Sequence, residues 1–220
     1  MLRLSAPIVA LAFVAVSCDE RSGDREGDID VVTANSELRL AATFHREVAE
    51  AGTWHLLVHE RGNMAGLACF TTNVTPLLFY EKLRAIGIEA EDVVDCGAMG
   101  DPDAATEGDV LEYSFEWEGS GRRVALDELF DEVVPTDTAA QLGLEMRFGG
   151  NHEGEDAEHP PSHRSGCLAC LYTCCAGVTS NRRANLALLR RENGEHRYRV
   201  LSEVGPPDGA AVTVFVGKRG

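Results

Sequence analysis

The chain has 220 residues, of which 44% are hydrophobic and 6% aromatic, and this length and composition suit one globular domain. Its formal net charge is -16 at pH 7, so the surface repels phosphate backbones and carries no excess of basic side chains. Composition and charge therefore exclude nucleic acid as an expected partner.

Residues 1–17 have the features of a signal peptide. Arg3 precedes an apolar run over residues 6–16 that is too short to span a bilayer. The end of this segment, Ala15-Val16-Ser17-Cys18, resembles the processing site of bacterial lipoproteins, so we expect lipid attachment at Cys18. An accidental cysteine after an ordinary signal peptide is the alternative. The lipid would anchor the protein to a membrane, on the periplasmic side of the bacterial cell envelope.

A polar, largely acidic segment follows the anchor and is expected to be a linker over residues 18–36. A single folded domain is then expected over residues 37–220. Its first clear signals are two runs rich in β-branched and apolar residues, TWHLLVHERG and LACFTTNV, with a turn at GNMAG between them. The sequence therefore predicts two strands at the start of the domain.

One helix is predicted over residues 75–86. Thr75 can cap the free amides at its start, and Pro76 suits the first helical turn. Gly87 suits the exit from the helix.

The second half of the domain is read mainly as strands. A hairpin is predicted for VLEYSFEWEGSGRRVAL, a short helix for LDELFDEVV, and further strands for LGLEMRFGG, HRYRVLSEV and AAVTVFVG. We therefore predict an α+β fold, mainly antiparallel strands with one principal helix, in a single domain.

Four cysteines crowd into one short segment, Cys167, Cys170, Cys174 and Cys175. On a straight helix the first and third would lie about 10.5 Å apart along the axis. One ion bound at about 2.3 Å from each sulfur could not reach both. Joint metal ligation by these four residues therefore requires a chain that folds back, which Gly166 and Gly177 would allow.

Two kinds of metal site fit these thiols. The C-x2-C-x3-C spacing resembles part of the bacterial ferredoxin motif and would hold an iron–sulfur cluster. A Zn²⁺ or Cu⁺ ion would instead be bound by thiolates together with a histidine, for which the candidates are His152, His159 and His163.

Disulfides are the third interpretation, in which the protein holds no cofactor. Outside the cytoplasm thiols tend to oxidise, and six cysteines remain once Cys18 carries a lipid. The candidate bridges are Cys167 with Cys170, and either Cys174 or Cys175 with Cys69 or Cys96.

Five segments together resemble the YdjY-type domain of bacterial envelope proteins, and they occur in the family's order over residues 37–217: TWHLLVHE, TNVTPLLFYEKLRAIG, EMRFGGN, GCLACLYTCCAGVTSN and VGPPDGAAVTVFV. The family's motif, GCxxCxxSCPxGxxxN, is matched at Gly166, Cys167, Cys170, Cys174, Gly177 and Asn181. This chain has Thr173 and Cys175 where the motif has serine and proline. The resemblance implies a ferredoxin-like label for the cysteines and no established activity.

The sequence contains no G-x-S-x-G elbow and no HExxH helix, so we do not expect an enzyme. The expected function is that of a lipid-anchored envelope protein whose cysteine cluster binds a metal or iron–sulfur centre or acts in thiol redox, alongside an unidentified envelope partner. The alternative is a structural or protein-interaction module that disulfides hold together.

Overall fold

The computed structural model describes residues 29–32, 36–91, 94–133, 141–151, 165–185, 187 and 197–220. The predicted signal peptide, Cys18 and the candidate ligands His152, His159 and His163 lie outside these ranges. In chain order, the strands are β1 (Ile29–Val32), β2 (Glu37–Phe44), β3 (His55–His59), β4 (Ala68–Thr72), β5 (Val110–Trp117), β6 (Val124–Ala125), β7 (Phe130–Val133), β8 (Met146–Arg147), β9 (Cys167–Cys170), β10 (Thr179–Asn181), β11 (Arg197–Val200) and β12 (Ala211–Lys218). The helices are α1 (Arg46–Ala51), α2 (Pro76–Ala85) and α3 (Leu126–Leu129), with 3₁₀ turns η1 (Ala65–Leu67) and η2 (Cys96–Gly100).

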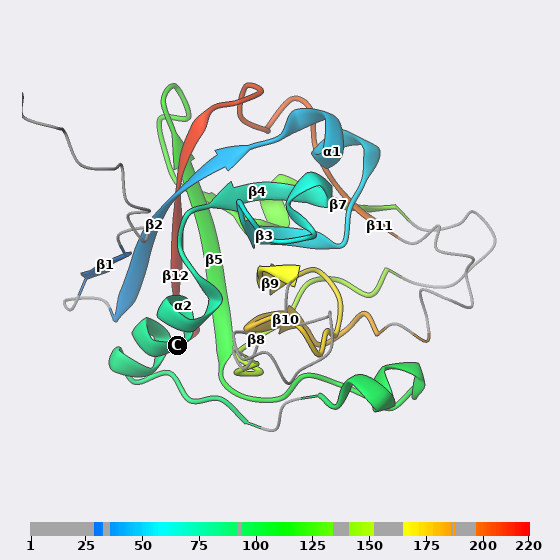
Figure 1. Ribbon diagram of the computed structural model, residues 1–220. Helices are drawn as coiled ribbons and strands as arrows, with labels where there is room; N and C mark the ends of the chain where they lie inside the picture. The colour runs from blue at the N-terminus through cyan, green and yellow to red at the C-terminus, as the bar shows by residue number, and fades with distance from the viewer. Residues whose placement is uncertain are drawn as a thin grey trace, which may run out of the picture.

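The main sheet closes on itself as a barrel (Figure 1). Its eight described strands follow the order β2-β12-β5-β8-β10-β9-β3-β4, and β4 pairs back onto β2. β1 lies inside the segment predicted as linker and pairs antiparallel with β2. β6 pairs antiparallel with β5. β7 and β11 form a separate two-stranded sheet.

The prediction of an α+β fold with one principal helix is wrong, because the regular secondary structure of the described residues is mainly strand, with a closed barrel and three short α-helices. The barrel was missed because β8 has two residues and β10 has three, too few to show an alternating pattern. Part of the predicted helix LDELFDEVV is also strand: α3 ends at Leu129 and the chain continues as β7, which pairs with β11.

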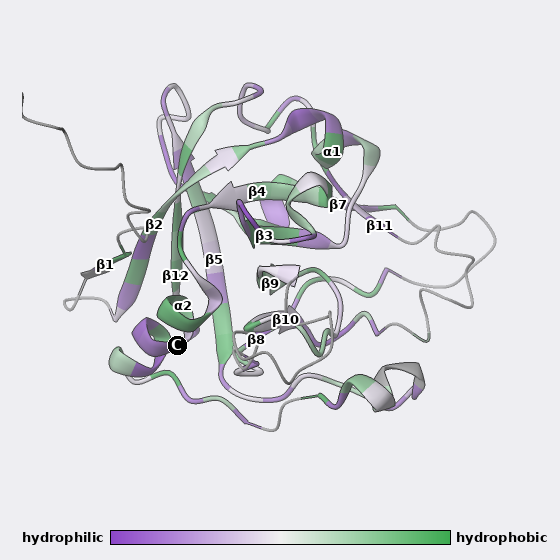
Figure 2. Ribbon diagram, viewed as in Figure 1, coloured by the Kyte–Doolittle hydropathy of each residue, from purple (hydrophilic) through white to green (hydrophobic). Residues whose placement is uncertain are grey.

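Three long antiparallel strands, β2, β12 and β5, form what we call the regular wall of the barrel. Val214 of β12 lies opposite Leu40 on one side and Phe115 on the other. Figure 2 shows β12 in the green of apolar residues. Inside the barrel the rings of Phe70 and Phe115 stack with centroids 4.9 Å apart. Burial of one such side chain stabilises the fold by about 1.5–3 kcal/mol.

The predicted hairpin and helix are confirmed. β5 and β6 pair antiparallel, and α2 begins where Thr75 Oγ1 accepts a hydrogen bond from the Leu78 amide. Gly87 follows the helix with φ of +83°, a conformation that favours glycine. Within the described ranges, no helix is both long enough and apolar enough to cross a membrane.

The other side of the barrel departs from antiparallel pairing. β3 pairs with β4 in parallel, and β9 pairs with β10 in parallel. Each parallel pair needs a return connection, and these connections are residues 60–67 and 171–178. β3 and β9 pair antiparallel between them, so the two returns belong to neighbouring strands (Figure 1). We call β3, β4, β9 and β10 the irregular wall.

Candidate metal centre

Bulges in β3 and β9 turn the cysteines toward one face. Val58 lies opposite Cys167, and its neighbour Leu57 lies opposite Ala169. Leu168 is therefore an extra residue in β9, with no partner of its own in β3. Leu168 and Ala169 consequently both join the main core. Cys167 and Cys170, which a regular strand would place on opposite faces, share a second, smaller cluster.

Side chains from the two return connections cover the second cluster. Its buried members are Val58, Ala68, Cys167, Cys170 and Cys174, and the side chains packed against them are Met64, Ala65, Tyr172 and Ala176. Met64 and Ala65 come from the connection 60–67, and the others from the connection 171–178. The site therefore exists because both parallel pairs send their returns over the same face.

Three donor atoms converge in this cluster. A ring nitrogen of His55 and the sulfurs of Cys167 and Cys170 lie within 4.8 Å of one another, and all three residues are buried. The His55 nitrogen is 3.5 Å from the Cys167 sulfur. Metal bonds of about 2.0 Å to nitrogen and 2.3 Å to sulfur, at tetrahedral angles, would also place these two atoms about 3.5 Å apart. The pair thus already has the spacing of two ligands of one ion.

Cys174 supplies a third thiol beside these donors. The Ala176 amide donates to its sulfur at 3.3 Å, and Tyr172 Oη lies 3.5 Å from the same sulfur. Interaction with the Cys170 thiol, together with these polar contacts, lowers the pKa of Cys174 despite its burial. Cys174 thus packs in the same buried cluster, although its sulfur is not among the three donor atoms that lie within 4.8 Å of one another.

Charge in the cluster is shared between the thiols and the imidazole. A hydrogen bond with Cys170 and then the contact with His55 lower the pKa of Cys167 to about 5, against the effect of burial. For His55, burial favours the neutral ring, but the hydrogen bond with Cys167 and the charges of Cys167 and Cys174 outweigh it and raise the pKa. The neighbouring sulfurs and burial raise the pKa of Cys170. The sulfur of Cys167 is therefore the one that most readily carries a negative charge beside the imidazole.

The fourth predicted ligand lies elsewhere. Cys175 forms a disulfide with Cys96, one of the bridges allowed by the sequence, and its sulfur is not a free thiolate. Cys167 and Cys170, the other candidate pair, are free thiols in the structure. Cys69 is a free, buried thiol within the main core.

The disulfide joins the loop after α2 to the cysteine segment. Nearby, Thr106 Oγ1 and Ser180 Oγ share a hydrogen bond, the Asn185 side chain donates to the Pro102 carbonyl, and Arg182 pairs with Glu107. Residues 94–109 are thus fastened along the segment that carries Cys174 and Cys175.

His55 is the ligand candidate that sequence reasoning missed. It begins the strand HLLVH, where a histidine looks like an ordinary strand residue. It is 112 positions from Cys167 in the chain, and only the pairing of β3 with β9 brings them together.

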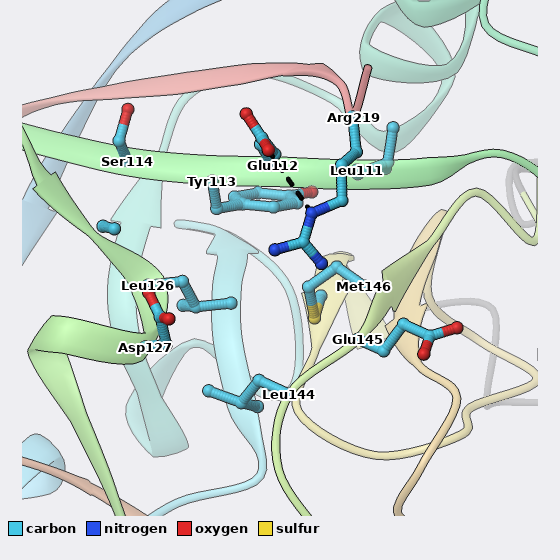
Figure 3. Close-up of a pocket in the computed structure, with 11 residues that line it drawn as sticks. Leu111, Glu112, Tyr113, Ser114, Leu126, Asp127, Leu144, Glu145, Met146 and Arg219 are labelled. Atoms are coloured by element: carbon cyan, nitrogen blue, oxygen red, sulfur yellow. Dashed lines mark ion pairs between the residues drawn. The ribbon is translucent and has the colours of Figure 1, made fainter.

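A surface pocket of about 240 Å³ lies between β5, α3 and β8 (Figure 3). Arg219 extends into it, with its Nε 3.4 Å from a carboxylate oxygen of Glu112. Glu145, also at the pocket, pairs with Arg147 and Arg183 at 2.6 and 3.1 Å. Arg219, Glu112 and Glu145 thus form ion pairs within the protein. The cysteine cluster is therefore the better candidate for the functional site.

Comparison with known sequences identifies the family. The sequence profile of the YdjY domain matches residues 29–217. The chain belongs to the YdjY domain family. A YdjY protein of Escherichia coli strain K12, described as uncharacterized, is 26% identical over 223 residues, which cover 94% of this chain and 92% of that protein. No solved structure matches the chain. The YdjY resemblance is thus confirmed, and the family name carries no activity.

Proposed function

We propose that this member of the YdjY family is a non-enzymatic envelope protein that holds one soft metal ion, bound by His55, Cys167 and Cys170, with the Cys174 thiol beside them. The convergence of an imidazole nitrogen and two sulfurs within 4.8 Å in a buried cluster carries this proposal. Thiols and an imidazole form a donor set that suits Zn²⁺ or Cu⁺.

A single ion suits this geometry better than an iron–sulfur cluster. Thiolates that bind different irons are held apart by the inorganic core between them. The His55 nitrogen and the Cys167 sulfur are already at the distance of two ligands that share one ion, and Cys175, which would be the fourth thiolate, is bridged to Cys96. The donor set therefore does not fit a four-cysteine cluster.

Burial argues against thiol exchange with another protein. Reactive cysteines are normally partly exposed, because a partner's sulfur must approach along a defined line. Cys167 is 1% exposed and Cys170 is 0% exposed. A metal ion is small enough to enter where a protein thiol is not.

We place the protein in the cell envelope, anchored through a lipid on Cys18. The support is the N-terminal sequence, and the Cys96–Cys175 disulfide agrees with an oxidising compartment. Mass spectrometry of the N-terminal peptide from membrane fractions would test this part: an acylated Cys18 is expected, and an intact residue 1–17 segment would contradict it.

The main test is elemental analysis of the full chain purified without oxygen. We expect about one zinc or copper ion per chain and no acid-labile sulfide. Cys170→Ser and His55→Ala should each remove most of the metal, whereas Cys69→Ala should keep it, since Cys69 is equally buried but lies in the main core. Metal retained in Cys170→Ser, or iron together with sulfide, would refute the proposal.

A structural module held by disulfides is the second candidate, and the Cys96–Cys175 bridge favours it. In that case the protein purified without oxygen would contain no metal, and its remaining cysteines would pair when air is admitted. A count of free thiols before and after exposure to air separates the two functions.

A further inference from the structure

A methionine lies at the outer edge of the thiol cluster. Met64 is half-buried, whereas Cys167, Cys170 and Cys174 are buried, and its side chain packs against their cluster. A thioether is a soft, uncharged donor, which binds Cu⁺ well and is not among the usual ligands of Zn²⁺.

The position of Met64 is built into the fold. Its amide donates to the Ser165 carbonyl at 3.2 Å, two residues before Cys167. Gly62 lies two residues earlier in the same loop, and a Cβ atom on it would lie 2.3 Å from the Ser165 carbonyl oxygen. Only glycine therefore lets the loop lie this close to Ser165. The loop is therefore fastened directly to the start of the strand that carries the thiols.

The surroundings of the cluster are soft and largely apolar. In the described part of the chain, the group of converging donors contains no carboxylate, the ligand that Ca²⁺, Mg²⁺ and Mn²⁺ prefer. The ring of Tyr172 meets His55 edge-on at 6.3 Å and Trp54 at 6.1 Å, which covers the imidazole side of the site. Such a shell limits the access of water and of hard ligands.

We propose that the ion is Cu⁺ and that its fourth ligand, beside His55, Cys167 and Cys170, is Met64 at the solvent edge, where the ion enters and leaves. This inference rests on the proposed metal-binding function and adds the identity of the ion. On binding, each coordinating thiol loses its proton to solvent and forms a sulfur–copper bond. Copper stays in the +1 state, so no electron donor or acceptor is needed.

The test compares Cu⁺ and Zn²⁺ binding by the metal-free full chain under anaerobic conditions, each against a chromogenic chelator. We expect the protein to prefer Cu⁺. Met64→Leu, which keeps nearly the same volume, should weaken Cu⁺ binding about tenfold or more and leave Zn²⁺ binding unchanged. Met146→Leu is the matched control, because Met146 is 1% exposed in the main core, and both affinities should persist.

A second measurement uses the unsubstituted sequence, so that the inference does not depend on a variant folding. In protein labelled with selenomethionine and loaded with Cu⁺, absorption at the selenium edge should reveal copper at bonding distance from one of the four methionines. The signal should be absent from labelled Met64→Leu protein.

The outcomes separate the two proposals. Zinc bound with no preference for Cu⁺, equal losses of both metals in Met64→Leu, or no selenium–copper signal would overturn the copper inference and leave the metal site standing. Failure of the unsubstituted protein to bind either ion would overturn the proposed function itself.

Discussion

The regular and irregular walls of the barrel differ in how their strands meet. In the regular wall, β12 pairs antiparallel with β2 and β5 along its length and without a break in register. In the irregular wall, two parallel pairs flank a bulged antiparallel one. The regular wall fills the interior with aromatic and aliphatic side chains, and strand β9 of the irregular wall turns Cys167 and Cys170 to a second face beside His55. Regular pairing thus builds the main core, and the departures from it bring the candidate metal ligands together.

The largest expected effect comes from breaking the regular wall. Phe115→Ala removes one ring of the Phe70–Phe115 stack and should lower the free energy of unfolding by about 3–5 kcal/mol. Urea denaturation measures this change, and the fraction that stays folded should still bind metal. As a control, Leu67→Ala alters a side chain that is 56% exposed and should change stability by less than about 0.5 kcal/mol. Equal effects of the two substitutions would contradict the assignment of the core.

A smaller loss of stability is expected at Gly62, where the loop 60–67 lies close to the backbone of Ser165. Gly62→Ala places a methyl group 2.3 Å from the Ser165 carbonyl oxygen, so the loop must move. We expect a loss of about 1–3 kcal/mol in stability and weaker metal binding. Gly66→Ala is the matched control in the same loop, because nothing lies within 4 Å of its added methyl group. Unfolding curves and metal titrations of both variants should differ, and matching curves would show that the close contact is not required.

The smallest effect concerns a charge beside the short strand β8. The hydrogen bond from Arg147, aided by Arg183, lowers the pKa of Glu145 despite partial burial. A carboxylate with a lowered pKa in the folded state adds stability above its unfolded pKa, and that stability is lost as the pH falls through the folded value. Glu145→Gln should therefore cost less than about 1 kcal/mol near neutral pH, and this cost should disappear as the pH falls below the folded-state pKa. Unfolding as a function of pH checks this, with Glu116→Gln, at an exposed position, as the control for the loss of one negative charge.

Local signals were readable from the sequence where one segment determines its own structure. Thr75 and Pro76 defined the start of α2, and alternation marked β5 and β12. The cysteines were identified as the centre of interest by their density alone. Sequence resemblance also identified the family, since the family motif is local too.

Long-range features could not be predicted in the same way. Closure of the barrel depends on β8 and β10, which are too short to show a period. The position of His55 beside the cysteines depends on bulges in β3 and β9. These bulges could not be predicted from residue type, because Leu168 is a common residue in regular strands. The choice of Cys96 as the partner of Cys175 likewise depends on how residues 94–109 return to the cysteine segment.

The adjacent positions of Cys174 and Cys175 have a consequence for maturation. One sulfur is a free thiol in the cluster and the next is bridged to Cys96. An oxidase meets both within one dipeptide, and a crosslink from Cys96 to Cys174 would remove a donor from the centre. If the chain binds the proposed ion early, the ion would shield Cys174 and leave Cys175 to pair with Cys96. Cells starved of that metal would then accumulate chains with the wrong disulfide.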